Sequence, residues 1–549
     1  MKQSWSRVSR WVLFAVLVGL IAVPARGVEQ PPGSVSQEPR LSQSVLVRQW
    51  LARPSDAPEP LRARFQAAHD KMAAAQGTQV SSSATGQPLS GARFNNDVVG
   101  FPQNEESIDV CRTNSKIVLG GTNDYRGLLD PQGNFTGWHF SNDGGRTLTN
   151  EGLLPPVPVA GAELASQGDP IDVVGRGCRL YAAGLNFNAF DTAAGQNAIG
   201  VNRTTPGRLV ACPGGSDPSC WPTRRAVAVN EAGHFLDKPW MDVGVSGDAG
   251  EVVWVVYTDF DCPNPDCEPP FTNQIKAVRC DAALTNCTAP ILISGAQNSL
   301  QFGDVTIGPD GRVYVTWEED NDLANNFEPP ERMRFWLRVA EPGSTTFGPL
   351  RPVANEPLNL GIADLHANDF RVATYPKNTV AMVQGRPRVF VVWDGCRART
   401  FGDTVCEEPA IKLRYSDDAG VTWSRTQVLS VGGDNYFPTI DTDPDTGRVA
   451  VAWYTTRFDP VFHNRQDVEL VSLNSATGGV ARRQRITPLS NDPEADPLLG
   501  GVFIGDYFEV AANNGTGFVH FNANYVSIRL LGEGFPIPQQ DNFLIRRPL

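Results

Sequence analysis

Short apolar strands alternate with turns along most of the chain, in a unit that occurs seven times. In each unit an apolar strand is followed by a turn and by a second strand of β-branched and aromatic residues, as in Glu251–Tyr257 and Arg448–Trp453. No helical periodicity lies inside the unit. The first strands centre on Ile108, Ile171, Met241, Val305, Val372, Ile440 and Phe508, roughly 65 residues apart. One such unit cannot bury both faces of its sheet, so the repeat predicts an all-β fold, a β-propeller of seven four-stranded blades, with six blades as the alternative.

The two ends of the repeat predict how the ring closes. The last unit has two strands and a third near Asn542–Arg546, but no outer strand. Asp97–Phe101 is a short apolar strand with no blade of its own. Pairing it with the last blade removes exposed sheet edges, so we expect Asp97–Phe101 to close the ring.

The N-terminal residues have the pattern of a secretory signal peptide. A basic start is followed by the apolar run Trp11–Val23 and by small residues before Gly27. We therefore expect residues 1–27 to be removed and the protein to be secreted, either extracellular or periplasmic. No later stretch has the length and hydrophobicity of a membrane span. We expect residues 28–93 to form a linker with a short helical N-terminal segment, and residues 94–549 to form the propeller.

Charge and cysteine content agree with secretion. The net charge of -13 argues against a nucleic-acid partner. All ten cysteines lie after the signal segment, and an even number in a secreted chain predicts disulfides. The expected pairs are Cys212–Cys220, Cys262–Cys267, Cys280–Cys287, Cys396–Cys406 and, across two blades, Cys111–Cys178.

Two segments carry a turn motif at the same place in different units. Ser141–Leu148 and Ser416–Trp423 both follow a third strand and fit the pattern S-x-D-x-G-x-x-[Trp or apolar]. This pattern resembles the Asp box, or BNR repeat, of the sialidase-like β-propeller superfamily. The Asp accepts turn N–H bonds and the Gly permits positive φ, so a structural role at the rim is expected. The residues concerned are Ser141, Asp143, Gly145, Ser416, Asp418, Gly420 and Trp423.

Polar residues gather where the first strands begin and the second strands end, which in a propeller is one face. The candidate catalytic residues there are Asp169, Asp237, Asp506, Glu106 and Tyr507, and the candidate substrate-binding residues are Asp124, Arg126, Lys238, Arg371 and Arg457. Paired carboxylates serve as acid and base on glycosidic bonds, and guanidinium groups bind acidic sugars. We expect Asp124, Arg126, Asp169, Asp237 and Asp506 to converge on one mouth of the channel, with one acid protonated and one ionised.

The resemblance implies glycan chemistry, and several interpretations remain open. Sialidases use three arginines and a Tyr nucleophile paired with Glu, for which Arg126, Arg371 and Arg457, and Tyr507 with Glu106, are the candidates here. The signature arginine of the first inner strand is absent, because that strand begins Glu105-Glu106. The expected function is therefore a glycosidase-like or lyase activity on extracellular glycans without a cofactor. Ca²⁺ held by the carboxylates, or a non-catalytic propeller that binds a glycan or protein partner, are the alternatives.

Overall fold

The computed structural model describes the repeat region and a few residues before it. The described residues are 53–56, 62–63, 66 and 92–549, except 189–194, 263–271, 296–298, 321–332, 357–364, 369, 398–405, 407, 500, 502 and 533. The predicted signal segment and nearly all of the predicted linker and helical segment lie outside them. Among the helices of this part of the chain, none has the length and apolar character needed to cross a bilayer.

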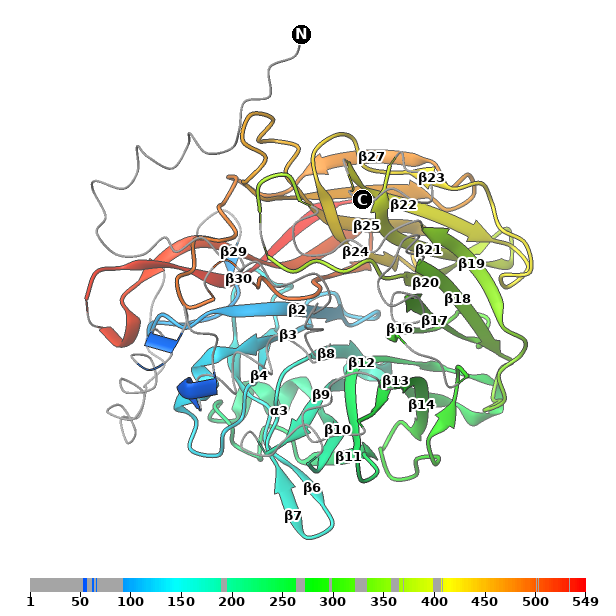
Figure 1. Cartoon of the computed structure of the whole chain (residues 1–549). Coiled ribbons are helices and arrows are strands. Elements are labelled where there is room, and N and C mark those ends of the chain that lie inside the picture. The colour runs from blue at the N-terminus through cyan, green and yellow to red at the C-terminus, as the bar shows by residue number, and fades with distance from the viewer. Residues whose placement is uncertain are drawn as a thin grey trace, which may run out of the picture.

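Seven four-stranded antiparallel sheets form the predicted β-propeller (Figure 1). Blade 1 contains β2 (Gln103–Val110), β3 (Val118–Asp124), β4 (Thr136–Ser141) and β5 (Asn150–Leu153). Blade 2 contains β8 (Ile171–Val174), β9 (Leu180–Phe187), β10 (Asn197–Thr204) and β11 (Thr223–Val229). Blade 3 contains β12 (His234–Val245), β13 (Glu251–Asp261), β14 (Thr272–Asp281) and β15 (Ile291–Leu292). Blade 4 contains β16 (Leu300–Ile307), β17 (Val313–Asp320), β18 (Met333–Ala340) and β19 (Arg351–Glu356). Blade 5 contains β20 (Lys377–Val383), β21 (Arg386–Cys396), β22 (Pro409–Ser416) and β23 (Gln427–Val428). Blade 6 contains β24 (Asn435–Thr442), β25 (Arg448–Thr455), β26 (Asp467–Asn474) and β27 (Val480–Arg485). A hairpin of β6 (Val157–Val159) and β7 (Ala162–Leu164) and the helix α3 (Pro206–Ala211) lie outside these sheets.

The seventh blade joins the two ends of the repeat, and its outer strand differs from the prediction. It contains β28 (Glu509–Asn513), β29 (Thr516–Ile528), β30 (Ile537–Pro548) and, from the N-terminal side, β1 (Ala92–Arg93). Figure 1 shows this red blade beside blade 1 in blue. The prediction that Asp97–Phe101 closes the ring is wrong. That segment is a loop, because the Asp97 carboxylate accepts the N–H groups of Val99 and Phe101 and so replaces strand pairing.

Blade 5 also begins later than predicted. Its first strand is β20, starting at Lys377, whereas the sequence placed its centre at Val372. Pro376 directly precedes β20 and has no N–H for a ladder, so it marks the start of pairing. Residues 370–376 lie outside the strands, and Arg371 and Tyr375 in this segment contact Asp506, where the first strand of blade 7 begins. We call the face where the first strands begin the upper face.

Carboxylates on the first strands link neighbouring blades around the channel. Asp109 accepts the N–H of Val174 in the next blade at 2.7 Å, and Asp242 accepts that of Ile307 at 2.6 Å. Asp441 binds the N–H of Ala512 at 2.7 Å in the same way. The inner edge of each sheet has N–H groups without a strand partner, and a buried N–H needs an acceptor. These acids therefore tie the blades together.

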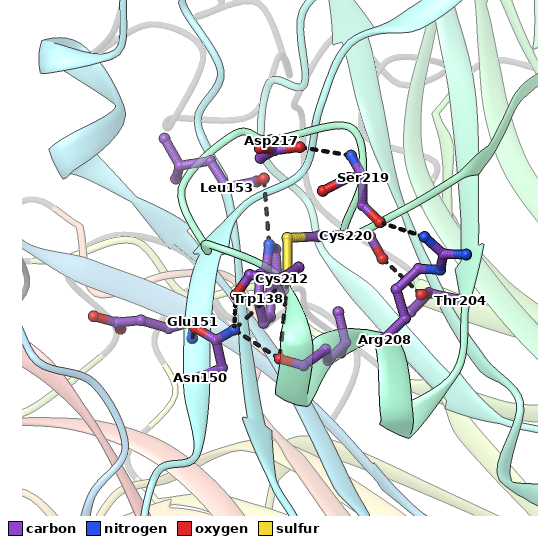
Figure 2. Close-up of a disulfide and its surroundings, with 11 residues drawn as sticks. Trp138, Asn150, Glu151, Leu153, Thr204, Arg208, Cys212, Asp217, Ser219 and Cys220 are labelled. Carbon is purple, nitrogen blue, oxygen red and sulfur yellow. Dashed lines mark hydrogen bonds between the residues drawn. A yellow bond between two sulfur atoms is a disulfide. The ribbon is translucent and has the colours of Figure 1, made fainter.

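Four of the predicted disulfides are confirmed: Cys111–Cys178, Cys212–Cys220, Cys280–Cys287 and Cys396–Cys406. The first joins blades 1 and 2, as expected. The predicted Cys262–Cys267 pair lies partly outside the described residues. Figure 2 shows that Cys212–Cys220 closes the loop after α3, and that Asn150 of blade 1 donates to the carbonyls of Leu209 and Cys212.

The two segments that resemble Asp boxes form the same turn at the rim. Ser141 donates to Asp143 at 2.9 Å, and Ser416 donates to Asp418 at 2.7 Å. Each Asp then accepts an N–H four residues later, from Thr147 or Thr422. These bonds are local to the turn, so they position the rim and leave the upper face to other residues.

Candidate functional site

The upper face is built from strained residues at the starts of the first strands. Glu105, Asp169 and Lys238 have φ of 58°, 53° and 50°, and Phe302 and Phe437 have φ of 51°. Left-handed φ is uncommon for residues other than glycine and costs conformational energy. Bulges interrupt the register at several of these positions, for example between Asp237 and Trp240. A bulge redirects a side chain, and here it turns side chains of several blades towards the channel mouth.

Three carboxylates lie around one ammonium group at this mouth, and a fourth acid is its neighbour in the sequence. The Lys238 Nζ forms an ion pair with Asp506 and lies 3.5 Å from Asp169 Oδ2 and 4.0 Å from Glu105 Oε1. Asp237, next to Lys238 in sequence, has no hydrogen-bond partner for either carboxylate oxygen. We call Glu105, Asp169, Asp237, Lys238 and Asp506 the acid ring.

Arg371 is a second cation bound to the acid ring, through Asp506. Its Nε donates to Asp506 Oδ1 at 3.0 Å, and its Nη2 donates to Oδ2 of the same carboxylate. A bidentate guanidinium bond is strong and fixes the plane of the carboxylate. The Arg371 side chain is 21% exposed, whereas those of Asp506 and Lys238 are 1% and 4% exposed. Arg371 is thus the part of this cluster that reaches solvent.

The ring holds carboxyl groups in different protonation states. Burial alone would raise the pKa of Asp506, but Arg371 and Lys238 outweigh it and lower this pKa to about 2. Burial, with the nearby charge of Asp169, raises the pKa of Asp237 to about 7. The same two causes raise the pKa of Glu105 well above its usual value. The ring therefore favours an ionised Asp506 together with a protonated Asp237 at mildly acidic pH.

Of the candidate residues, the structure places Asp169, Asp237, Asp506, Lys238 and Arg371 in this cluster. Asp124 and Arg126 lie just outside the ring. The Arg126 guanidinium is bound between Asp124 and Glu151, with 3.0 Å from Nη1 to Glu151 Oε1. The connection to the ring passes through the neighbouring Asn123, which donates to Glu105 at 2.7 Å and accepts the Asp169 N–H at 3.0 Å.

Tyr507 and Glu106 are not a pair in the structure. The Tyr507 hydroxyl donates to the carbonyl of Pro170 at 2.9 Å. Glu106 faces Asn522 at 3.5 Å, and it is Glu105 that turns into the ring. The sequence cannot reveal that Glu105, and not Glu106, points into the ring, because a bulge shifts the alternation of side chains by one residue.

The three candidate arginines do not form one carboxylate-binding group. Arg126 binds Asp124 and Glu151, Arg371 binds Asp506, and Arg457 binds Glu469 at 2.6 Å. Each guanidinium has carboxylate partners of its own, and the partners of the three arginines belong to three different blades. The arrangement expected for a sialidase is therefore not assembled.

Aromatic side chains around the ring were missed from the sequence. Phe302 stacks on Tyr375 with 4.6 Å between centroids, and the Lys238 ammonium lies 5.5 Å from the Phe302 ring. Arg371 lies 5.4 Å from the Phe503 ring. In the sequence, each of these side chains is only an aromatic residue near the start of a strand. Without the positive φ, such a residue cannot be distinguished from one that packs in the core.

A second group of acids lines the lower channel, where a cavity of about 390 Å³ opens. Asp109, Asp242 and Asp441 all border it, but each accepts an N–H of the next blade. Their first role is thus to hold blades together. Within the described part of the chain, no three His, Cys, Asp or Glu side chains are arranged to hold a metal ion. In the acid ring the Lys238 ammonium takes the central position.

No family model matches this chain, and no curated protein matches it either. Solved structures with a similar fold include the Hadza microbial sialidase Hz136, with 11% identity, 75% of this chain and 73% of that chain covered, and a TM-score of 0.40. An alpha-L-arabinanase of Penicillium chrysogenum has 11% identity, coverage of 84% and 98%, and a TM-score of 0.39. The endosialidase of phage phi92 has 10% identity, coverage of 85% and 72%, and a TM-score of 0.41. These likenesses concern the propeller fold and transfer no site to this chain.

Proposed function

We propose that the protein is a secreted enzyme that cleaves glycans by acid–base chemistry at the upper face, with the acid ring as its centre. One feature of the acid ring carries the proposal: Arg371 and Lys238 lower the pKa of Asp506 to about 2, whereas burial raises the pKa of Asp237 to about 7. Glycosidic bond cleavage needs one carboxylic acid to protonate the leaving oxygen and one carboxylate to act as base or nucleophile. Two carboxyl groups in opposite states supply these roles.

Arg371 supports a substrate-facing role for the ring. The Arg371 side chain is partly exposed to solvent, and its guanidinium is held by hydrogen bonds to Asp506. A substrate that binds Arg371 would thus be oriented directly above the ionised carboxylate. The reaction needs no cofactor, since the ring supplies both acid and base. Four disulfides and the signal-like N-terminus support an oxidising compartment.

A non-catalytic glycan-binding propeller is the second candidate, and burial favours it. Asp169, Asp237 and Glu105 are at most 1% exposed. In this alternative the ring stabilises the channel mouth, and the ligand contacts only the surface around Arg371.

A cleavage assay with matched variants separates the two candidates. The mature protein is incubated with neutral and acidic polysaccharides and with a sialyl reporter, and new reducing ends are measured. We expect cleavage of at least one glycan, with Asp506→Asn and Asp237→Asn each lowering the rate on the order of 100-fold or more. Asp418→Ala, in the rim turn, is the control and should retain the rate. Binding of a glycan without cleavage, or full activity of both ring variants, would reject the proposal.

A further inference from the structure

The cavity of the lower channel is lined by acids that the proposed function does not use. Its volume of about 390 Å³ is typical of a site for a small molecule. In six of the seven blades the first strand contributes an acid to the lining, and in blade 5 it contributes Lys377. The six acids are Asp109, Asp172, Asp242, Asp304, Asp441 and Glu509. The lining is therefore strongly acidic and favours a positively charged ligand.

Asp172 is a buried acid of this lining. The residue is 2% exposed, and neither of its carboxylate oxygens has a hydrogen-bond partner among the described residues. On one side the carboxylate lies against Gly121 of blade 1, where a Cβ would overlap it. The cavity is therefore the side from which a partner can approach. Burying a carboxylate without a partner is costly, so this position favours a ligand that donates hydrogen bonds and carries positive charge.

The acids lie at two depths of the channel. Ser107 Oγ accepts the Asp172 N–H at 2.7 Å and donates to Glu509 Oε2 at 2.5 Å, which places Asp172 and Glu509 at one depth. Asp109 lies two residues further along β2, roughly 7 Å deeper. Valine and isoleucine side chains of several blades also line the cavity. Two positive groups joined by a short hydrocarbon chain match this pattern.

Lys377 shows how the cavity binds an alkyl ammonium group. Its Nζ lies 3.7 Å from Asp304 Oδ1 and over the face of the Trp240 ring. A carboxylate and an aromatic face both attract an ammonium group. In the described part of the chain no three acids are arranged to hold a metal ion. An organic cation therefore fits this lining better than a metal ion does.

The cavity opens beside Arg112, on the side opposite the upper face. The Arg112 side chain is 41% exposed, and its Nη2 lies 3.4 Å from Asp441 Oδ2. Met382, which also borders the cavity, is 42% exposed. Arg112 follows the end of β2, and Met382 lies near the end of β20. A ligand can therefore enter without passing the acid ring, and it meets the positive charge of Arg112 at the opening.

We propose that the lower channel binds a linear aliphatic diamine, with Asp172 and Glu509 binding one ammonium group and Asp109 binding the other. The hydrocarbon chain of the diamine lies against the valine and isoleucine side chains. The first ammonium group supplies the hydrogen-bond donors and the positive charge that the Asp172 carboxylate lacks. This site is separate from the acid ring and does not depend on the proposed function.

Isothermal titration calorimetry of the mature protein with putrescine at pH 8 tests the proposal. We expect one site per chain. Asp172→Asn keeps the shape of the side chain but removes its charge, so the affinity should fall on the order of 10-fold or more. Arg112→Gln removes a positive charge from the opening of the cavity, so the affinity should rise. Asp248→Asn, at an exposed position of the turn after β12, is the matched control and should leave the affinity unchanged.

The pH dependence of binding gives a second readout. Burial raises the pKa of Glu509 and Asp242 to about 7 and that of Asp109 to about 6. Bound ammonium groups favour the ionised carboxylates, so binding at pH 7 should release protons and should be weaker at pH 5 than at pH 8. Burial lowers the pKa of Lys377 to about 7, so this lysine loses its competing charge over the same range. The other charged groups that border the cavity are Arg112, Asp172, Asp304, Asp441 and Asp443.

Several results would overturn the proposal. They are an absence of putrescine binding, equal affinity of the wild-type protein and Asp172→Asn, and tighter binding at pH 5 than at pH 8. Displacement of putrescine by an equal concentration of Ca²⁺ would assign the cavity to a metal ion. If Asp172→Asn does not fold, Arg112→Gln decides, because unchanged or weaker binding by that variant contradicts a cation in this cavity. Each of these results leaves the proposed glycan cleavage unaffected, since no readout involves cleavage.

Discussion

Lys238 and Asp506 are 268 residues apart in the sequence, and their side chains form an ion pair at the channel mouth. Lys238 lies in β12 of blade 3, and Asp506 lies just before β28 of blade 7. The contact therefore forms only when the ring of blades is closed. Arg371, from the segment before blade 5, binds the same carboxylate, so one Asp side chain joins three parts of the propeller.

Asp506→Asn should destabilise the fold strongly. The variant removes the buried carboxylate that Lys238 and Arg371 share, and breaking a buried ion pair costs about 3–5 kcal/mol. Urea unfolding measures the change in free energy. The control is Asp417→Asn, because Asp417 is 56% exposed in its pair with Arg388 and should contribute about 1 kcal/mol or less. Equal losses for the two variants would contradict the role assigned to Asp506.

Stability should fall as the pH rises from about 4 to 7. Burial raises the folded-state pKa of Asp237, Asp242 and Glu509 to about 7, while the unfolded values stay near 4. In that window the folded state binds more protons than the unfolded state, so stability present at pH 4 is lost by pH 7. Below pH 4 the opposite holds for Asp506, whose folded pKa is about 2, and stability falls as that carboxylate is protonated.

Calorimetric Tm values across this range test the prediction. We expect a maximum near pH 4–5. Asp237→Asn mimics the protonated side chain and should flatten the decline towards pH 7. Burial also lowers the pKa of Lys377 to about 7, so this lysine favours unfolding below pH 10 and some stability should return between pH 7 and 10. A Tm that rises steadily from pH 4 to 7 would contradict the protonated state of the buried acids.

Asp242→Ala should loosen the contact between blades 3 and 4. The variant removes the acceptor of the Ile307 N–H, and an unsatisfied buried group costs about 1–3 kcal/mol. Asp242→Asn keeps a carbonyl oxygen and should lose less. Asp248→Ala, at an exposed position of the turn that follows β12, is the control for chemical denaturation. If Asp242→Ala and Asp248→Ala have the same midpoint, the inter-blade bond is not stabilising.

Asp418→Ala should cost about 1 kcal/mol, because its turn bonds are made at an exposed position. Asp143→Ala, in the equivalent turn of blade 1, should behave alike. Neither should change the affinity for a glycan. Glycan binding that weakens without a loss of stability would move the binding site to the rim.

The sequence predicted the number of blades and four disulfides because strand alternation and turn spacing are local and repeat. It placed Asp169, Asp237, Asp506, Lys238 and Arg371 on one face by the same logic. It failed for Glu106 and for Asp97–Phe101, where a bulge and an Asp-centred loop override the alternation. Asp172 was missed because it lies within β8, whereas the candidate acids were taken from the ends of strands.

The proposed chemistry depends on a protonated Asp237 and an ionised Asp506 in the same acid ring at the channel mouth. Difference infrared spectroscopy of the wild-type protein and Asp237→Asn at pH 5.5, a value chosen below the folded pKa of about 7, measures this directly. We predict that the wild-type protein shows the C=O band of a protonated buried carboxyl that the variant lacks, and that Asp506→Asn removes a carboxylate band instead. If Asp237→Asn removes only a carboxylate band, both acids are ionised and the ring does not hold the acid and base that the proposed chemistry requires.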